Sequence, residues 1–225
     1  MIFFLVVIWY NGINLGVIIM TEKERMEKGL IYLPMDKEIL DKQLGYIDLV
    51  HKYNKIKATN LAKRKKMLKK MFGSVGENCY FEAPIFSNFG CKHVFVGNHV
   101  YANFNLTLVD DGNIYIGDHT MIAPNVTIAT AGHPINAKLR QIGYQYNQDV
   151  HIGKNVWIGA GVIIMPGVNI GDNTIIGAGS IVTKDIPSGV VAVGNPCKVL
   201  REVGERDDKY FFKNLEIDWE NLNEK

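Results

Sequence analysis

A six-residue period constrains this chain more than any other feature of its sequence. From residue 152 the hexads read IGKNVW, IGAGVI, IMPGVN, IGDNTI, IGAGSI and VTKDIP, and each opens with an aliphatic residue. The same pattern occurs earlier, from Val96 and from Ile116. A large aliphatic residue followed by a small one gives a short strand and a tight corner, because the small residue lets the backbone turn without a Cβ clash. We therefore expect an all-β-dominated protein whose coils, of three hexads each, stack into a triangular solenoid with internal aliphatic ladders.

The hexads also set the expected domain boundaries. Residues 74–200 are expected to form the solenoid. Residues 20–73, which are rich in Lys, Glu, Leu and Met, are expected to form a helical N-terminal region. Residues 201–225 form a C-terminal tail. Because the hexad pattern lapses between Gly132 and Ile152, residues 133–149 are expected to leave the solenoid as a loop.

The first nineteen residues have two interpretations. Their nearly uncharged, apolar sequence resembles a membrane anchor or signal segment, but Asn11 interrupts it and no basic segment precedes it. Directly after Met20, Thr21 and Glu24 form a capping-box pattern that would begin a helix there. We therefore interpret residues 1–19 as a mis-called upstream extension, with an N-terminal anchor as the alternative, and do not favour a membrane partner.

Charge and cysteine content narrow the functional classes. A net charge of +2, without aromatic residues interleaved among basic ones, does not predict a nucleic-acid partner. The three cysteines, Cys79, Cys91 and Cys197, are odd in number and lack CxxC spacing, so they indicate neither a disulfide framework nor a zinc ribbon. We expect a cytoplasmic protein without a metal.

Longer motifs reveal a resemblance to a known family. The stretches are VGENCYFEAPIF, VYANFNLTLVDDGNIYIGD, MIAPNVTIATAGHP, VWIGAGVIIMPGV, IGAGSIVTKDIP and VGNPCKVLRE. From Thr21 to about Phe212 the chain resembles the galactoside and maltose O-acetyltransferases of the hexapeptide-repeat acyltransferase superfamily. This resemblance implies a left-handed parallel β-helix, a handedness that the hexads alone do not specify. It also implies a homotrimer that binds acetyl-CoA between neighbouring prisms and transfers acetyl directly to a sugar hydroxyl.

His133 is the candidate catalytic residue, at the root of the interruption and directly before Pro134. A base must remove the hydroxyl proton as the acceptor oxygen attacks the thioester, and an imidazole that titrates near neutral pH suits this task. From spacing alone, a loop histidine that bonds a backbone carbonyl is the alternative. The resemblance implies that His133 is the general base.

The resemblance also implies an acceptor pocket. It places Asn88, Tyr101, Asn103 and Asp111 there, from the stretches SNFG and YANFNLTLVDD. Asn103 and Asp111 are alternatively corner residues, since Asn and Asp tolerate tight bends. Asp110 is a weaker candidate, because two adjacent carboxylates do not easily face one site.

For the acetyl donor, the resemblance points to two kinds of residue. Lysine and arginine would bind the phosphates, and small residues would let the cofactor lie against the coil. The Ala160 amide would stabilise the negatively charged oxygen of the intermediate. Trp157 would wall the channel of the pantetheine arm, and the alternative is an exposed corner residue that a trimer partner buries. The full set is Trp157, Ala160, Ala178, Thr183, Lys184, Lys198 and Arg201.

Departures from the family pattern leave the identity of the acceptor open. Leu33 and Pro34 stand where close relatives carry an acidic sugar contact, and Gln145 replaces a more apolar residue. An antibiotic or another non-sugar hydroxyl compound is the alternative acceptor. Two further alternatives are a non-catalytic binding module and a zinc enzyme like the γ-class carbonic anhydrases, with His99 and His119 as ligands.

Overall fold

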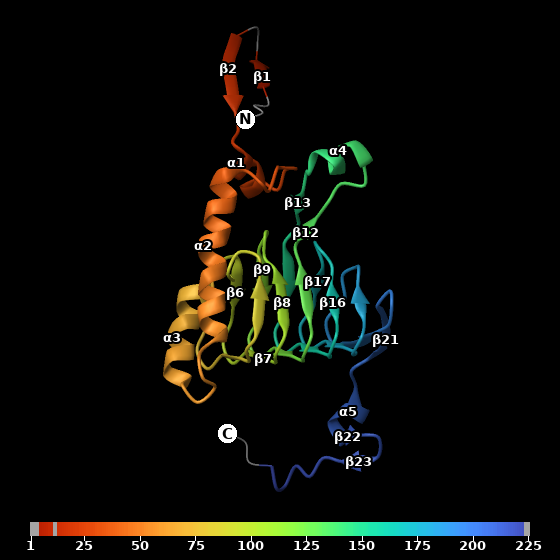
Figure 1. The fold of residues 1–225 in the computed structure, drawn as a ribbon. Coiled ribbons are helices and arrows are strands. Elements are labelled where there is room, and N and C mark those ends of the chain that lie inside the picture. Colours follow the sequence, from red (N-terminus) through yellow and green to blue (C-terminus); the bar gives the residue numbers. More distant parts are fainter. Residues whose placement is uncertain (1–4, 11–12, 223–225) are drawn as a thin grey trace.

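Short parallel strands build most of this protein, as the hexads predict (Figure 1). The computed structural model describes residues 5–10 and 13–222. Three sheets form the three faces of a triangular prism, and neighbouring strands in each face come from successive coils. The first face contains β3 (Ser74–Val75), β6 (Val94–Val96), β9 (Ile114–Ile116), β14 (Val150–Ile152) and β17 (Asn169–Ile170). The second contains β4 (Tyr80–Phe81), β7 (Tyr101–Ala102), β10 (Met121–Ile122), β15 (Trp157–Ile158), β18 (Ile175–Ile176), β20 (Val190–Val193) and the antiparallel β21 (Lys198–Glu202). The third contains β5 (Ile85–Ser87), β8 (Leu106–Val109), β11 (Thr127–Ala129), β16 (Ile163–Ile164) and β19 (Ile181–Val182).

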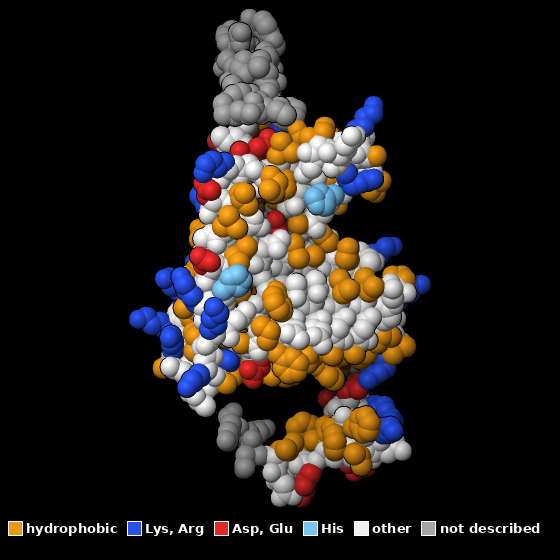
Figure 2. All heavy atoms as spheres, in the orientation of Figure 1, with side chains coloured by type: hydrophobic (Ala, Val, Ile, Leu, Met, Phe, Trp, Pro, Cys, Tyr) orange, Lys and Arg blue, Asp and Glu red, His pale blue; other side chains and the backbone are white. Residues whose placement is uncertain are grey.

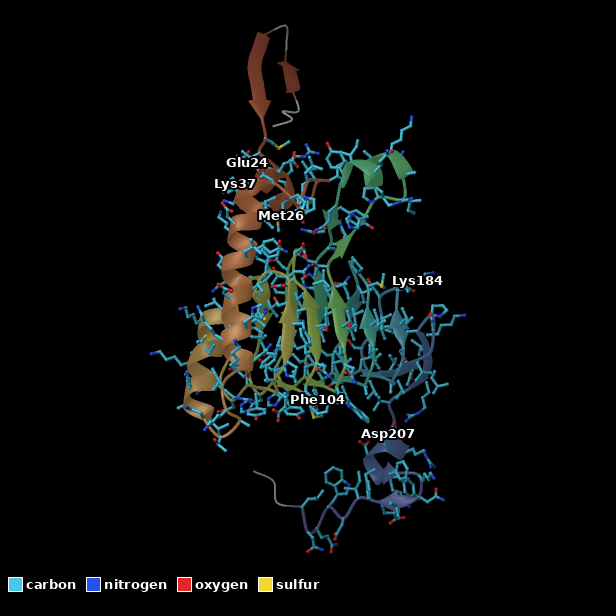
Figure 3. The ribbon with its side chains drawn as sticks, viewed as in Figure 1. Glu24, Met26, Lys37, Phe104, Lys184 and Asp207 are labelled. Carbon is cyan, nitrogen blue, oxygen red and sulfur yellow. The ribbon has the colours of Figure 1, made fainter. Side chains whose placement is uncertain are left out.

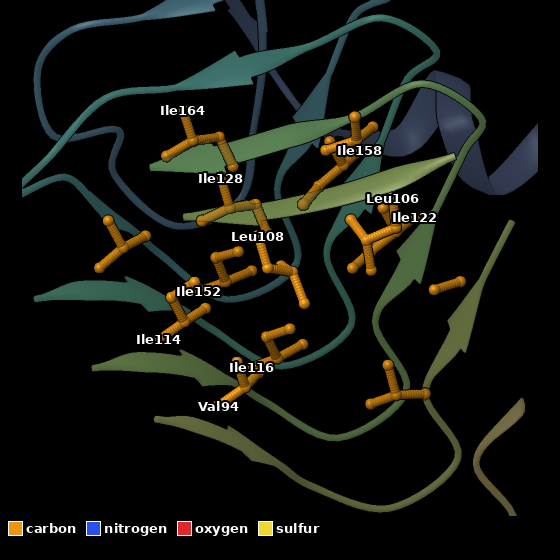
Figure 4. Close-up of a cluster of buried hydrophobic side chains, with 14 of the residues drawn as sticks. Val94, Leu106, Leu108, Ile114, Ile116, Ile122, Ile128, Ile152, Ile158 and Ile164 are labelled. Carbon is orange, nitrogen blue, oxygen red and sulfur yellow. The ribbon is translucent and has the colours of Figure 1, made fainter. Parts of the chain in front are cut away.

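The core consists of the aliphatic ladders that the hexads predict. In the parallel register, Ile158 of β15 pairs with Ile122 on one side and with Ile176 on the other. Figure 4 shows such side chains stacked inside the prism. The predicted ladder is confirmed, because every residue that opens a hexad is at most 3% exposed: Ile152, Ile158, Ile164, Ile170, Ile176 and Val182.

Two edges of the prism position the candidate residues. At the loop edge, the third face turns into the first through residues 110–113, and one coil later through the excursion of residues 130–149. At the glycine edge, the second face turns into the third through residues 103–105, 123–126, 159–162 and 177–180. Gly161 and Gly179 each turn there with φ of +69°, a left-handed conformation that glycine adopts without strain.

The helices α2 (Lys37–Asn54) and α3 (Leu61–Met71) cover the first coil, and α1 (Glu22–Glu27) packs against α2. The capping box predicted at Thr21 and Glu24 is present, with both of its hydrogen bonds formed. At the end of α2, Tyr53 donates its hydroxyl hydrogen to the Phe81 carbonyl, and the Asn54 amide bonds both backbone groups of Ile85. These contacts join the helices to the first strands of the prism and close that end of the core.

The excursion is more ordered than the loop that the sequence predicts. Its ends, β12 (Ala131–Gly132) and β13 (Tyr146–Asn147), pair antiparallel, and the short helix α4 (Ala137–Ile142) lies between them. The Asn136 side chain accepts hydrogen bonds from two amides at the start of α4, and Gly143, with φ of +99°, ends it. Asn is a common residue at the start of a helix and Gly at its end. The residues that interrupt the hexads therefore specify a local structure of their own.

The N-terminal residues and the tail lie outside the prism. The strands β1 (Leu5–Tyr10) and β2 (Ile13–Ile19) pair as an antiparallel hairpin, while residues 1–4 and 11–12 lie outside the described residues. The two interpretations of residues 1–19 stay predictions. Within residues 5–10 and 13–222, no helix is long and apolar enough to cross a membrane. After β21, the tail forms α5 (Glu205–Lys209), β22 (Tyr210–Phe212) and β23 (Leu215–Glu216), which lie below the prism in Figure 1.

Candidate active site

His133 lies on the excursion, one residue beyond β12, with its ring exposed. Its Nδ1 lies 2.8 Å from the carbonyl oxygen of Tyr144, across the excursion. A carbonyl oxygen only accepts hydrogen bonds, so this contact assigns the hydrogen to Nδ1 and leaves Nε2 as a free acceptor. The arrangement gives the imidazole the tautomer that a general base requires.

The backbone around His133 is held closely. A Cβ at Gly132 would lie 2.8 Å from the hydroxyl oxygen of Tyr146, so a larger residue at this position would displace the Tyr146 ring that lies over it. Pro134 follows His133 and restricts its backbone. The root of the excursion therefore limits how far the imidazole moves.

Asp111 lies at the loop edge, one coil before His133, and is 6% exposed. One carboxylate oxygen accepts a hydrogen bond from Asn88 Nδ2 at 2.9 Å, and the other accepts one from Gln145 Nε2 at 2.9 Å. The structure thus brings Asn88 and Asp111 together, as the resemblance implies. A hollow of about 490 Å³ opens beside Asp111, and its wall also contains Met26, His93, Asn113, Asn147 and Asp149.

Asp110 points into the prism. Its Oδ1 accepts hydrogen bonds from the Ser87 hydroxyl and the Phe89 amide, at 2.7 and 2.8 Å. Burial raises the pKa of Asp110, because an ionised carboxylate is poorly solvated there. This residue therefore fixes the corner, and its neighbour Asp111 presents the carboxylate toward the hollow.

Asn103 and Tyr101 lie at or near the other edge of the third face. Asn103 is at the glycine edge, where its Oδ1 accepts the Phe104 amide hydrogen at 2.8 Å, and Tyr101 stacks on Tyr80 with ring centroids 6.2 Å apart. Figure 3 shows Phe104, the neighbour of Asn103, at the edge opposite Lys184. Within one chain, the structure does not bring Asn103 or Tyr101 to His133.

The candidate donor-binding residues fall on the same two edges, on β15 of the second face and on β21. Ala160 and Ala178 lie at the glycine edge in successive coils, and the Gly179 amide donates to the Ala160 carbonyl at 2.8 Å. Thr183 and Lys184 follow β19 at the loop edge and are exposed. Trp157, on the second face, is 54% exposed.

Two further donor candidates, Lys198 and Arg201, lie on β21. The guanidinium of Arg201 already has a partner, because both of its terminal nitrogens contact the Asp207 carboxylate at 2.7 Å. That paired hydrogen bonding lowers the pKa of Asp207 to about 2. An incoming phosphate would therefore compete with this carboxylate for the two terminal nitrogens.

The proposed zinc ligands His99 and His119 do not converge. Their rings are stacked 4.8 Å apart at an interplanar angle of 3°, so the nitrogen lone pairs lie in two parallel planes. Among the residues that the structure describes, no group of three or more His, Cys, Asp or Glu side chains is placed to hold a metal ion. The geometry gives no support to the zinc alternative.

Two parts of the chain match known protein families. Residues 149–184 match the bacterial transferase hexapeptide (six repeats), and residues 25–76 match the maltose acetyltransferase hexapeptide capping motif. A solved galactoside acetyltransferase in complex with coenzyme A superimposes with a TM-score of 0.85 at 45% identity, covering 88% of this chain and 99% of the other. A maltose O-acetyltransferase from Clostridium difficile 630 gives a TM-score of 0.80 at 46% identity, covering 83% of this chain and 99% of the other. The prism is thus a left-handed β-helix of the hexapeptide-repeat acetyltransferase class.

Curated relatives define the family more narrowly. The galactoside O-acetyltransferase of Lactococcus lactis is 48% identical over 195 residues, which are 87% of this chain and 94% of that protein. The galactoside O-acetyltransferase of Escherichia coli is 45% identical over 195 residues, which are 87% of this chain and 96% of that protein. This chain belongs to the galactoside and maltose O-acetyltransferase family, as its motifs predict.

Sequence reasoning missed two residues of the site. Tyr32 and Asn147 are buried and hydrogen-bonded to each other, and both contact the amide of Gln145. The only signal at Tyr32 was its aromatic side chain in GLIYLP, beside the departures Leu33 and Pro34. Because Tyr32 and Asn147 lie 115 positions apart, no local pattern joins them.

Proposed function

We propose that this protein transfers the acetyl group of acetyl-CoA to a hydroxyl of a sugar, such as a galactoside, a glucoside or a maltose-like acceptor. The observation that carries the proposal is the Nδ1 contact of His133 with the Tyr144 carbonyl, which leaves Nε2 free to take a proton. Membership of a family whose relatives are galactoside O-acetyltransferases supports both the reaction and the acceptor class.

The chemistry needs one proton transfer at His133. Nε2 removes the proton of the acceptor hydroxyl while the oxygen attacks the thioester carbonyl. The Ala160 amide would donate to the oxygen that becomes negative, and the departing thiolate would recover the proton from the imidazolium. Asn88 and Asp111 would orient the acceptor, with Asn103 and Tyr101 on its other side.

A complete site requires a second copy of the chain. Asn103 and His133 lie at opposite edges of the third face, and the strand of four residues between these edges spans about 13 Å. We infer a homotrimer in which the loop edge of one protomer faces the glycine edge of the next. Figure 2 shows apolar side chains along the lower edge of the prism. Phe104, at the glycine edge, and Met121 and Trp157, on the second face, are each about half exposed. Such a surface suits burial between protomers.

The donor would bind along the same groove. Coenzyme A occupies the related galactoside acetyltransferase structure, which supports an acetyl-CoA site here. Ala160 and Ala178 would allow close approach to the coil, and Thr183, Lys184, Lys198 and Arg201 would contact the phosphates. We also infer a reducing, cytoplasmic setting, because Cys79, Cys91 and Cys197 are all free thiols.

A thiol-release assay tests the proposal. The purified protein is incubated with acetyl-CoA and a panel of galactosides, glucosides, maltose and hydroxylated antibiotics. Release of CoA with the sugars and not with the antibiotics supports the proposal. Release with an antibiotic alone would favour the alternative acceptor, and no release above the rate without acceptor would refute the function.

A further inference from the structure

A short backbone pairing joins the N-terminal segment to the excursion. Tyr32, between α1 and α2, forms an antiparallel bridge with Gln145, and each residue donates its amide hydrogen to the carbonyl of the other at 2.9 Å. Both residues are buried. The N-terminal segment therefore lies against the part of the excursion that precedes β13.

The side chains of these two residues continue the contact toward Asp111. Gln145 Nε2 lies 2.6 Å from the Tyr32 hydroxyl oxygen, 2.9 Å from Asp111 Oδ1 and 3.3 Å from Asn147 Oδ1. An amide nitrogen carries two hydrogens, so the two shorter contacts satisfy it. Tyr32 in turn donates to Asn147 at 3.2 Å. Burial raises the pKa of Tyr32, so its hydroxyl keeps that hydrogen throughout the neutral range.

These contacts place one neutral amide donor on each oxygen of Asp111. Asn88 holds Oδ2 and Gln145 holds Oδ1. A carboxylate oxygen has room for about two hydrogen bonds, so each retains capacity for a hydroxyl of the acceptor. These two donors fix the rotation of the carboxylate. Both are neutral amides, so neither contact neutralises the negative charge of Asp111.

We propose that Gln145 is a positioning residue for the acceptor: held by Tyr32, its carboxamide fixes the Asp111 carboxylate in the orientation that binds an acceptor hydroxyl. This inference rests on the proposed function. On this inference, Tyr32 and the segment after α1 contribute to the specificity for the acceptor, although neither touches the reacting atoms. The neighbouring Tyr144 holds His133 through its backbone, so a change confined to the Gln145 side chain acts on Asp111 and leaves the base in place.

The test compares substitutions that keep volume but remove one hydrogen bond. Gln145→Met removes the donor to Asp111, and Tyr32→Phe removes the hydroxyl that holds Gln145. Gln141→Met, on the exposed face of α4, and Tyr46→Phe, in the same small apolar cluster as Tyr32, are the matched controls. Each full-length protein is assayed for kcat and for KM of both substrates, and its melting temperature is measured.

We expect a selective effect on the acceptor. Loss of a hydrogen bond to a charged group weakens binding about tenfold or more, so Gln145→Met should raise the acceptor KM at least tenfold. The KM of acetyl-CoA should change less than about twofold, and Tyr32→Phe should give a smaller shift in the same direction. Both controls should match the wild type. An unchanged acceptor KM, or an equal loss in both KM values and in melting temperature, would overturn the inference.

Gln145→Glu adds a readout that a purely structural role would not give. The introduced carboxyl group can donate to Asp111 while it is protonated, whereas its ionised form repels Asp111. The ratio of the variant's acceptor KM to that of the wild type, in which Asp111 and His133 titrate as well, should therefore rise with pH through the acidic range. A ratio that does not change with pH counts against the inference.

The inference and the proposed function can fail separately. If the wild type acetylates no acceptor, the proposed function fails by itself. The crystal structure of Gln145→Met then decides the inference: a rotated Asp111 supports it, and an unmoved one refutes it.

Discussion

Asn103 and Asp111 lie at the two ends of one strand, β8, and so at opposite edges of the prism. Both belong to the motif YANFNLTLVDD, which the family resemblance places in one pocket. The strand is rigid within its sheet, since β5 and β11 pair with it on either side. The two residues can therefore serve one site only if two protomers contribute one residue each.

This arrangement predicts complementation between two inactive variants. His133→Ala and Asn103→Ala should each be nearly inactive when purified alone. Subunits mixed at equal ratio and re-associated should recover about a quarter of wild-type activity, because one groove in four then has both intact residues. Activity is measured by CoA release before and after re-association. Recovery absent from a mixture that light scattering shows to be trimeric would mean that each chain carries its own site.

The proposed role of His133 as general base predicts that its removal lowers turnover without loss of structure. His133→Ala should lower kcat by at least about two orders of magnitude, since general base catalysis contributes on that scale. The ring is exposed and its Nδ1 contacts a backbone carbonyl, so the melting temperature should stay near that of the wild type. Steady-state kinetics and calorimetry check both expectations. Turnover within tenfold of the wild type would remove His133 from the mechanism.

The sequence predicted the prism because its information is local and repeated. An aliphatic residue such as Ile158 or Ile176 must be buried wherever a coil forms, and the register then stacks one on the other. The contact of Gln145 with Asp111 was not predictable in this way. Gln145 appeared in the sequence only as a departure from the family pattern, and its partner Tyr32 is 113 positions away. Such contacts depend on where the excursion and the N-terminal segment meet, which no period encodes.

The ion pair of Arg201 and Asp207 predicts an effect on donor binding. Asp207→Asn should free the guanidinium for a phosphate of CoA and lower the KM of acetyl-CoA a few fold, whereas Arg201→Ala should raise it. Initial-rate kinetics over a range of acetyl-CoA concentrations measures the change. An increase of KM in Asp207→Asn would show that the carboxylate orients Arg201 for the donor and does not compete with it.

The same pair has a defined pH dependence. Arg201 lowers the pKa of Asp207 to about 2 in the folded chain, below its ordinary value of 3.8. A depressed carboxylate pKa contributes stability above the ordinary value, and that contribution is lost as the pH falls toward 2. The attachment of the tail to β21 should therefore stay constant through the neutral range and weaken only in strong acid. Limited proteolysis at pH 7, 4 and 2.5 measures how far the tail has detached from β21. In Asp207→Asn the tail should be cleaved at pH 7 as readily as in the wild type at pH 2.5.

The internal ladder predicts where the fold is most sensitive. Ile158 is fully buried between Ile122 and Ile176, so Ile158→Ala leaves a cavity that neighbouring coils cannot close without breaking register. Such a truncation should cost about 2–5 kcal/mol of unfolding free energy. Ile135→Ala, at a position 94% exposed in the excursion, is the matched control and should cost less than about 0.5 kcal/mol. Denaturant unfolding of both variants measures the difference. Equal costs at the two positions would mean that the ladder does not carry the stability of the prism.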